Sequence, residues 1–338
     1  MKFIHILLFY FTSICFLSSL EGQKKSLYSS IFEIDGLINV NINTNLGHLV
    51  RKSSKEEYQQ AEITIYDESS SELIALPGRI RARGNMRKKQ CRYPPIKIDF
   101  KKSDLDSLGY KKKIDKLKMV FPCRGGNGNQ EKLYKEYLLY DIYKIIDPKG
   151  LNAKLSNVTF IEEDGKETQF TGMFVEEEKA YKRRTDAKII ESGNLRAPSL
   201  DRDLYLKMSF FQFMIANTDY SVANKHNLEM VKHPDNRRVV AIPYDFDYSG
   251  FVGQHYAVPH ESLPIEDVNE RYFFVKDLTI AEFNKMVTYF LSIEDQVNNT
   301  IESASYMDDK NRKMSKHYLK SFFDMLRKPK VLRRQIIE

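Results

Sequence analysis

The stretch "ANTDYSVANKHNLEMV", residues 216–231, places an aspartate and several asparagines directly before a short apolar run. Asp219 follows an expected helix, and the apolar run is typical of a strand. A second polar stretch, "PYDFDYSG" (residues 243–250), follows the next apolar run and contributes Asp245 and Asp247. A turn would explain any one of these residues. Their order along the chain favours a site that binds a metal ion and phosphate.

The two apolar runs predict a β-hairpin that turns at Pro234–Asn236. Such a hairpin brings Asn227 and Asp245 to the same end of two paired strands. Their oxygen atoms are ligands that suit Mg²⁺ or Mn²⁺. Asp247 lies two residues further, on the same side of an extended segment, and is a candidate second carboxylate ligand. Asn224 is an alternative to Asn227, which we favour because it directly precedes the strand.

The remaining sequence predicts an α+β protein with a β-rich lobe over about residues 28–180 and a mainly helical lobe over about 181–338. Alternating apolar residues indicate strands in the first third, and helical spacing dominates the last third. The composition, 42% hydrophobic and 29% charged, is that of a globular chain with a sizeable core. Strands are expected at 32–43, 61–67, 78–85, 94–102 and 115–122, a hairpin at Asp164–Gly165, and helices at 131–146, 199–219, 280–292 and 316–326.

Residues 1–22 have the layout of a secretory signal peptide: Lys2, an apolar run, then small residues. The apolar run is short for a membrane span, although an uncleaved anchor is the alternative. We therefore expect an exported protein, periplasmic, on the cell surface or secreted, with no transmembrane span in the mature chain. Outside this segment the cysteines are Cys91 and Cys123, which predict one disulfide, with two free thiols as the alternative.

The net charge of +7 allows an anionic partner without specifying it. Because the sequence has neither a nucleic-acid motif nor a basic groove interleaved with aromatic residues, we expect no nucleic-acid partner. A basic surface that binds polyanions is the weaker interpretation.

Three segments resemble the spore coat protein H (CotH) kinase family, and together they span roughly residues 78–253. They are "RIRARGN" with "PPIKIDF", then "TGMFVEEE", and finally "NTDYSVANKHN" with "PYDFDYSG". Members are secreted or coat-associated atypical protein kinases with a diverged protein-kinase-like two-lobe fold. The resemblance implies a kinase domain over residues 23–338 that transfers the γ-phosphoryl group of ATP to a protein hydroxyl. It also implies ATP and Mg²⁺ or Mn²⁺ as cofactors, and a protein substrate or surface and coat proteins as partners.

Carried over by position, Asp219 resembles the catalytic aspartate that orients or deprotonates the acceptor hydroxyl. Asn227 and Asp245 resemble the metal ligands. Lys97 resembles the lysine that contacts the nucleotide phosphates, with Arg83 assisting it.

Other roles remain open. Lys118 is the alternative to Lys97, because in kinases the strand before the first long helix carries the lysine. Glu136 on that helix is expected to pair with either lysine, and Glu178 to line the nucleotide pocket. Arg87–Lys89 is interpreted as a solvated turn.

The chain also departs from the family and from protein kinases: the interval from Asp219 to Asn227 is longer than in protein kinases, and no compact glycine-rich loop is present. An inactive surface or coat scaffold with the same fold is therefore the alternative function.

Overall fold

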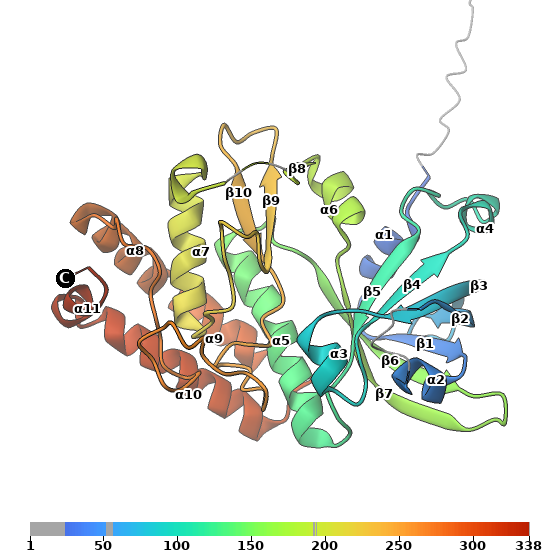
Figure 1. Cartoon of the computed structure of the whole chain (residues 1–338). Coiled ribbons are helices and arrows are strands. Elements are labelled where there is room, and N and C mark those ends of the chain that lie inside the picture. Colours follow the sequence, from blue (N-terminus) through green and yellow to red (C-terminus); the bar gives the residue numbers. More distant parts are fainter. Residues whose placement is uncertain (1–23, 52–56, 192, 194, 338) are drawn as a thin grey trace, which may run out of the picture.

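Strands from the N-terminal half of the chain form a closed barrel in the computed structural model, which describes residues 24–51, 57–191, 193 and 195–337 (Figure 1). The expected signal peptide over residues 1–22 lies outside the described residues. The neighbours in the barrel follow the order β1-β2-β3-β4-β5-β7-β6. The strands are β1 (Ile38–Asn43), β2 (Gln59–Tyr66), β3 (Glu72–Ala82), β4 (Ile96–Phe100), β5 (Lys116–Val120), β6 (Ala153–Ile161) and β7 (Glu167–Val175).

The barrel closes through parallel pairing of β1 with β6, in which Ile38 lies opposite Ser156. The other pairs are antiparallel. Alternation within each strand explains the interior: in β2, for example, Ala61, Ile63 and Ile65 are buried and the residues between them are not. Short helices cover the barrel and its ends: α1 (Leu27–Phe32), α2 (Leu46–Arg51), α3 (Met86–Gln90), α4 (Lys102–Ser107) and α6 (Glu178–Thr185).

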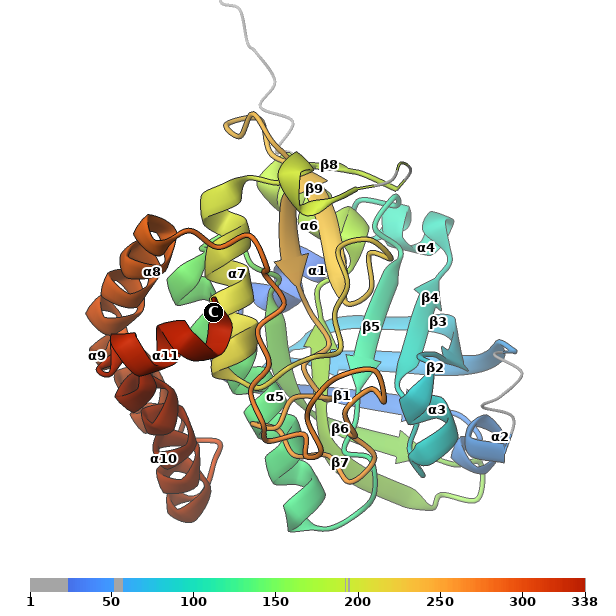
Figure 2. The same ribbon diagram turned by 60° about the vertical axis from the view of Figure 1, so that its left-hand side comes forward.

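The C-terminal part is mainly helical and contains a small antiparallel sheet. Figure 2 shows this sheet on one side of α7 and the helices α8 to α11 on the other side of α7. The sheet has the order β10-β9-β8. Its strands are β8 (Lys188–Ile189), β9 (Leu228–Lys232) and β10 (Val240–Pro243), and the helices are α7 (Arg202–Met214), α8 (Ile280–Ser292), α9 (Glu294–Glu302), α10 (Asp309–Leu326) and α11 (Pro329–Ile336).

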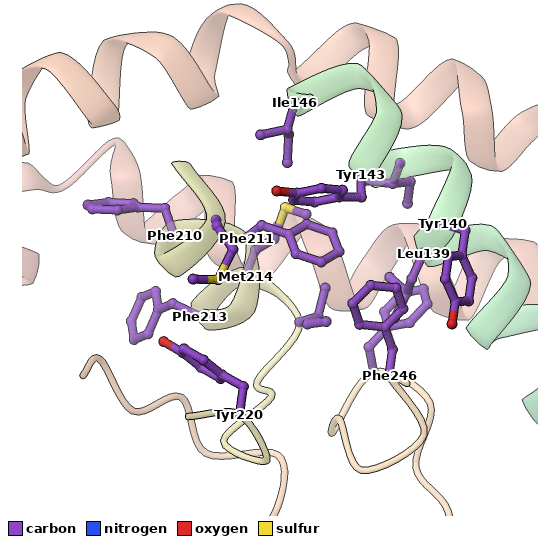
Figure 3. Close-up of a cluster of buried hydrophobic side chains, with 14 of the residues drawn as sticks. Leu139, Tyr140, Tyr143, Ile146, Phe210, Phe211, Phe213, Met214, Tyr220 and Phe246 are labelled. Carbon is purple, nitrogen blue, oxygen red and sulfur yellow. The ribbon is translucent and has the colours of Figure 1, made fainter. Parts of the chain in front are cut away.

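Helix α5 (Asn127–Ile146) follows β5 in sequence but packs into the C-terminal core. Figure 3 shows its side chains, among them Tyr140 and Tyr143, facing those of α7 and Phe246. The rings of Tyr143 and Phe211 lie 5.0 Å apart, and those of Tyr140 and Phe246 lie 4.9 Å apart. The barrel interior forms a separate hydrophobic cluster. Helix α5 is therefore held by the helical region while it lies directly against the barrel strands β6 and β7.

The structure confirms a mixed α/β chain with a strand-rich N-terminal region and a helical C-terminal region. It also confirms the disulfide, because Cys91 and Cys123 are bonded. The closure of the barrel was not predicted, and α5 begins at Asn127 rather than at residue 131. Helix α1 was not predicted, and β1 begins at Ile38 rather than at residue 32. Among the described residues, no helix is both long and apolar enough to cross a membrane.

Candidate active site

A cleft of about 790 Å³ brings together five of the residues selected from the sequence. Its lining includes Arg83, Asp219, Asn227, Asp245 and Asp247. One wall follows β3 and leads into α3, and the other is formed by the segments that flank the β9–β10 hairpin. Residues 258–261 border the cleft as well. Acidic side chains that are 26 positions apart in sequence thus share one concave surface with an arginine.

The predicted hairpin is present, and it explains why Asn227 and Asp245 meet. Leu228 lies opposite Pro243 in the β9–β10 pairing. Beyond that pair, the backbone N–H of Tyr244 donates to the carbonyl oxygen of Asn227 at 3.1 Å. The two candidate ligands therefore leave the same end of the hairpin, as the sequence predicted.

The long interval between Asp219 and Asn227 is taken up by a small loop. Ser221 and His226 form an isolated antiparallel bridge, with reciprocal backbone hydrogen bonds of 3.1 and 2.9 Å. Residues 222–225, which lie between them, therefore form a short loop. Asn224 lies in this loop, is exposed, and does not line the cleft, so the geometry favours Asn227 over it.

Asp219 is held in place by hydrogen bonds from both sides. The Nδ2 group of Asn227 donates to the carbonyl oxygen of Asp219 at 2.7 Å and to its Oδ2 at 2.9 Å. The backbone N–H of Asp219 donates to Oδ1 of Asn217 at 3.0 Å. Asn217 is buried and bonds in turn to Gln212 at the end of α7. Asn217 was missed as a site residue, although its position two residues before the aspartate was visible in the motif.

Three residues around the cleft adopt left-handed backbone conformations. Asn227 has a φ of 52°, Asp245 a φ of 59°, and Ala216, which precedes the Asn-x-Asp motif, a φ of 50°. This region is tolerated by asparagine and aspartate and disfavoured for alanine. Strained backbone of this kind concentrates at functional sites, where surrounding structure must hold it in place.

Arg87 on α3 is the main residue that sequence reasoning assigned wrongly. It was placed in a solvated turn, but it is 6% exposed. Its guanidinium pairs with Glu136 on α5 and donates from Nε to Oδ2 of Asp247 at 2.8 Å. Glu136 therefore pairs with Arg87 and not, as expected, with Lys97 or Lys118. A run of three basic residues gives no sign in the sequence of which side chain points inward.

Asp247 is oriented by this contact and by a second one. The hydroxyl of Tyr256 donates to the same Oδ2 at 2.6 Å. Helix α5 contributes again through Tyr140, whose hydroxyl oxygen accepts from the backbone N–H of Asp245 at 3.2 Å. Glu136 acts on Asp247 through Arg87, and Tyr140 contacts Asp245 directly. One face of α5 therefore positions both aspartates of the Asp-Phe-Asp segment.

Burial makes two carboxylates of the cleft, those of Asp219 and Asp245, more basic than usual. Burial and the negative charge of Asp247 raise the pKa of Asp245 to about 6. Burial also raises the pKa of Asp219 above its ordinary value, against the effect of the His226 side chain, whose Nε2 lies 3.1 Å from Oδ1. A nearby cation would favour the ionised form of Asp245 and so lower its pKa again.

Lys97, Lys118 and Glu178 do not line the cleft. The two lysines lie opposite each other on β4 and β5. Burial lowers the pKa of both, and the charges of Glu177, Glu178 and Arg83 also act on Lys118. Lys118 lies in β5 two residues before Val120, which does line the cleft. The choice between Lys97 and Lys118 stays open.

The donor atoms of the cleft fit a hard divalent cation. Over the described ranges, no three His, Cys, Asp or Glu side chains converge closely enough to hold a metal ion. A metal here would use the amide oxygen of Asn227 in addition to carboxylate oxygens. Because Nδ2 of Asn227 donates to Asp219, its Oδ1 points to the opposite side of the amide. Mg²⁺ commonly uses one or two carboxylates, retained waters and substrate phosphates.

No protein-family model matches the chain, and no curated protein matches it in sequence. Among solved structures it is similar to the Helicobacter pylori proinflammatory kinase CtkA, with a TM-score of 0.41 and 9% sequence identity, over 70% of this chain and 94% of that chain. A likeness at this level does not establish a shared fold, so the site has to be interpreted from its own geometry.

Proposed function

We propose that the protein is an exported, CotH-like atypical protein kinase with a diverged two-lobe fold. In this proposal it transfers the γ-phosphoryl group of ATP to a protein hydroxyl, with Mg²⁺ or Mn²⁺. The observation that carries the proposal is the shared cleft of Asp219, Asn227 and Asp245, in which Asn227 donates two hydrogen bonds to Asp219. Phosphoryl transfer requires mainly positioning and charge stabilisation, and this set of groups can supply both.

In the proposed reaction, Asp219 binds the acceptor hydroxyl and holds its proton as the hydroxyl oxygen bonds to the γ-phosphorus. The bond from that phosphorus to the bridging oxygen of ADP breaks, and ADP leaves with the electron pair. The raised pKa of Asp219 suits a group that takes up a proton. Asn227 and Asp245, with Asp247 behind them, would hold a divalent cation, which neutralises phosphate charge when bound. Arg83 lines the same cleft and would contact the phosphates.

The decisive experiment measures ³²P transfer from γ-labelled ATP to the protein itself and to casein, with Mg²⁺ or Mn²⁺. Asp219→Asn keeps the shape of the side chain and is expected to lower transfer at least about a hundredfold. Asp235→Asn, a change at an exposed residue that pairs with Lys149, is the matched control. Equal activity of wild type and Asp219→Asn would contradict the proposal. So would the absence of activity in both proteins when both are folded.

The second candidate function is an inactive surface or coat scaffold. It is favoured by the absence of both Lys97 and Lys118 from the described lining of the cleft. ATP separates the two functions. A protein that binds ATP gains about 2.7 kcal/mol of stability at a concentration one hundred times the Kd, and a scaffold shows no ATP-dependent shift in Tm.

A further inference from the structure

A basic hollow of about 690 Å³ lies at the opposite end of strands β4 and β5 from the cleft. Eight of its twelve lining residues are lysine or arginine, and they come from four segments: Lys24, Lys102 at the start of α4, the loop 111–113, and residues 179–183 of α6. Figure 1 shows α4 and α6 on the same side of the molecule. Positive charge is therefore gathered around a concavity by folding, and not by one basic run.

Part of this charge is neutralised within the hollow. Lys24 and Lys112 pair with Asp106, and Lys102 and Lys179 lie within 4.0 Å of the buried Asp115. Four cations of the lining remain, namely Lys111, Lys113, Lys182 and Arg183, and the lining contains one further carboxylate, that of Asp186. Lys113, Lys182 and Arg183 are exposed, and in the described part of the chain no ion pair is recorded for them. These three are available to an anionic partner.

We propose that this basic hollow docks an acidic segment of a polypeptide. A flat membrane surface would not fill a hollow of about 690 Å³. Binding of single-stranded nucleic acid relies on several aromatic stacking platforms, and the lining contains one aromatic residue, Tyr110. Carboxylates carried on successive side chains match cations that are spread over several segments.

The position of the hollow relative to the cleft suggests whose segment it is. Strand β4 runs from Ile96, which follows Pro95 of the cleft lining, to Phe100, two residues before Lys102 of the hollow, and β5 returns from Lys116 to Val120 at the cleft. Five strand residues span about 15–17 Å, a distance that about five residues of extended polypeptide also cover. A protein bound at the hollow could therefore reach the cleft with a neighbouring hydroxyl. Assigning the segment to the phosphoacceptor protein rests on the proposed function; the docking surface itself does not.

The test is binding of a fluorescein-labelled oligoglutamate peptide, followed by anisotropy at low and high salt. The variant Lys113→Gln/Lys182→Gln/Arg183→Gln is expected to bind about tenfold more weakly, since three exposed charge pairs together are worth about one decade of affinity. The matched control, Lys310→Gln/Lys313→Gln/Lys330→Gln, changes the net charge equally on α10 and α11. It is expected to bind like wild type, and equal unfolding midpoints confirm that both variants fold.

Equal weakening in both triple variants overturns the inference, because it shows attraction by net charge alone. Tighter binding of polyphosphate or of phosphatidylserine vesicles than of oligoglutamate also overturns it, because the partner is then of another class. A kinetic arm uses casein: the hollow variant should raise KM and leave kcat unchanged. If oligoglutamate binding follows the expectation but no phosphoryl transfer occurs in any variant, the docking surface stands and the proposed kinase function fails.

Discussion

Replacing Arg87 with methionine should destabilise the protein far more than replacing an exposed arginine. Methionine keeps much of the length of the side chain but removes the charge that joins two buried carboxyl groups. Glu136 is 1% exposed and Asp247 is 5% exposed. Removing one partner of a buried ion pair costs about 3–5 kcal/mol, because the remaining charge is left without compensation.

The lower end of this range is expected for Arg87→Met. Burial raises the pKa of Glu136 and the charge of Arg87 lowers it, so this pKa rises further when Arg87 is removed. Glu136 can therefore take up a proton when Arg87 is absent, which leaves Asp247 as the main unpaired charge. A loss of about 3 kcal/mol corresponds to a fall in Tm of roughly 5 °C in a chain of this size.

The assay is equilibrium unfolding in urea at neutral pH, supported by calorimetry. Arg327→Met is the matched control, because Arg327 pairs with Glu294 and Asp324 while its side chain is 49% exposed. Its loss should be at most about 1 kcal/mol. If Arg87→Met costs no more than this control, the reasoning that Arg87 links α3, α5 and the Asp-Phe-Asp segment is refuted.

Three further outcomes are expected. Glu282→Gln should lose stability relative to wild type above about pH 4.5, with the difference vanishing as the pH falls towards 2, since hydrogen bonds from an arginine lower the pKa of Glu282 to about 2; urea titrations across this range check it. Replacing both Cys91 and Cys123 with serine should cost about 3–4 kcal/mol by the loop-entropy estimate for a separation of 32 residues, measured by unfolding under non-reducing conditions. Asn227→Ala should abolish ³²P transfer while Asn224→Ala leaves it unchanged; the reverse result would make Asn224 the ligand.

Local patterns predicted the elements that carry the candidate site. The hairpin that joins Asn227 to Asp245 follows from two apolar runs and a turn, so short-range information was sufficient. Helix α8 was predicted with its observed bounds, Ile280–Ser292, and the structure shows a capping box at its start, in which Thr279 and Glu282 bond reciprocally. Such signals lie within a few residues of each other and need no knowledge of the fold.

Long-range partners could not be predicted in the same way. Arg87 meets Glu136 and Asp247, which are 49 and 160 positions away in sequence. A pattern of charges along one segment contains no information about such distances. The pairing of Glu136 with a lysine was wrong for this reason. The roles of Lys97 and Lys118, and the boundary between lobes near residue 180, remain predictions.

The parallel contact between β1 and β6 has a consequence for the order of folding. Ile38 and Ser156 are 118 positions apart, and β1 obtains one of its two neighbours only after β6 has left the ribosome. Until then one edge of β1 has unpaired backbone N–H and C=O groups. Such an exposed edge can pair with a strand of another chain. Closing so long a loop is also slow compared with forming a hairpin. The barrel therefore completes itself late, after α5 has been synthesised, and a nascent chain that ends before residue 153 cannot close it.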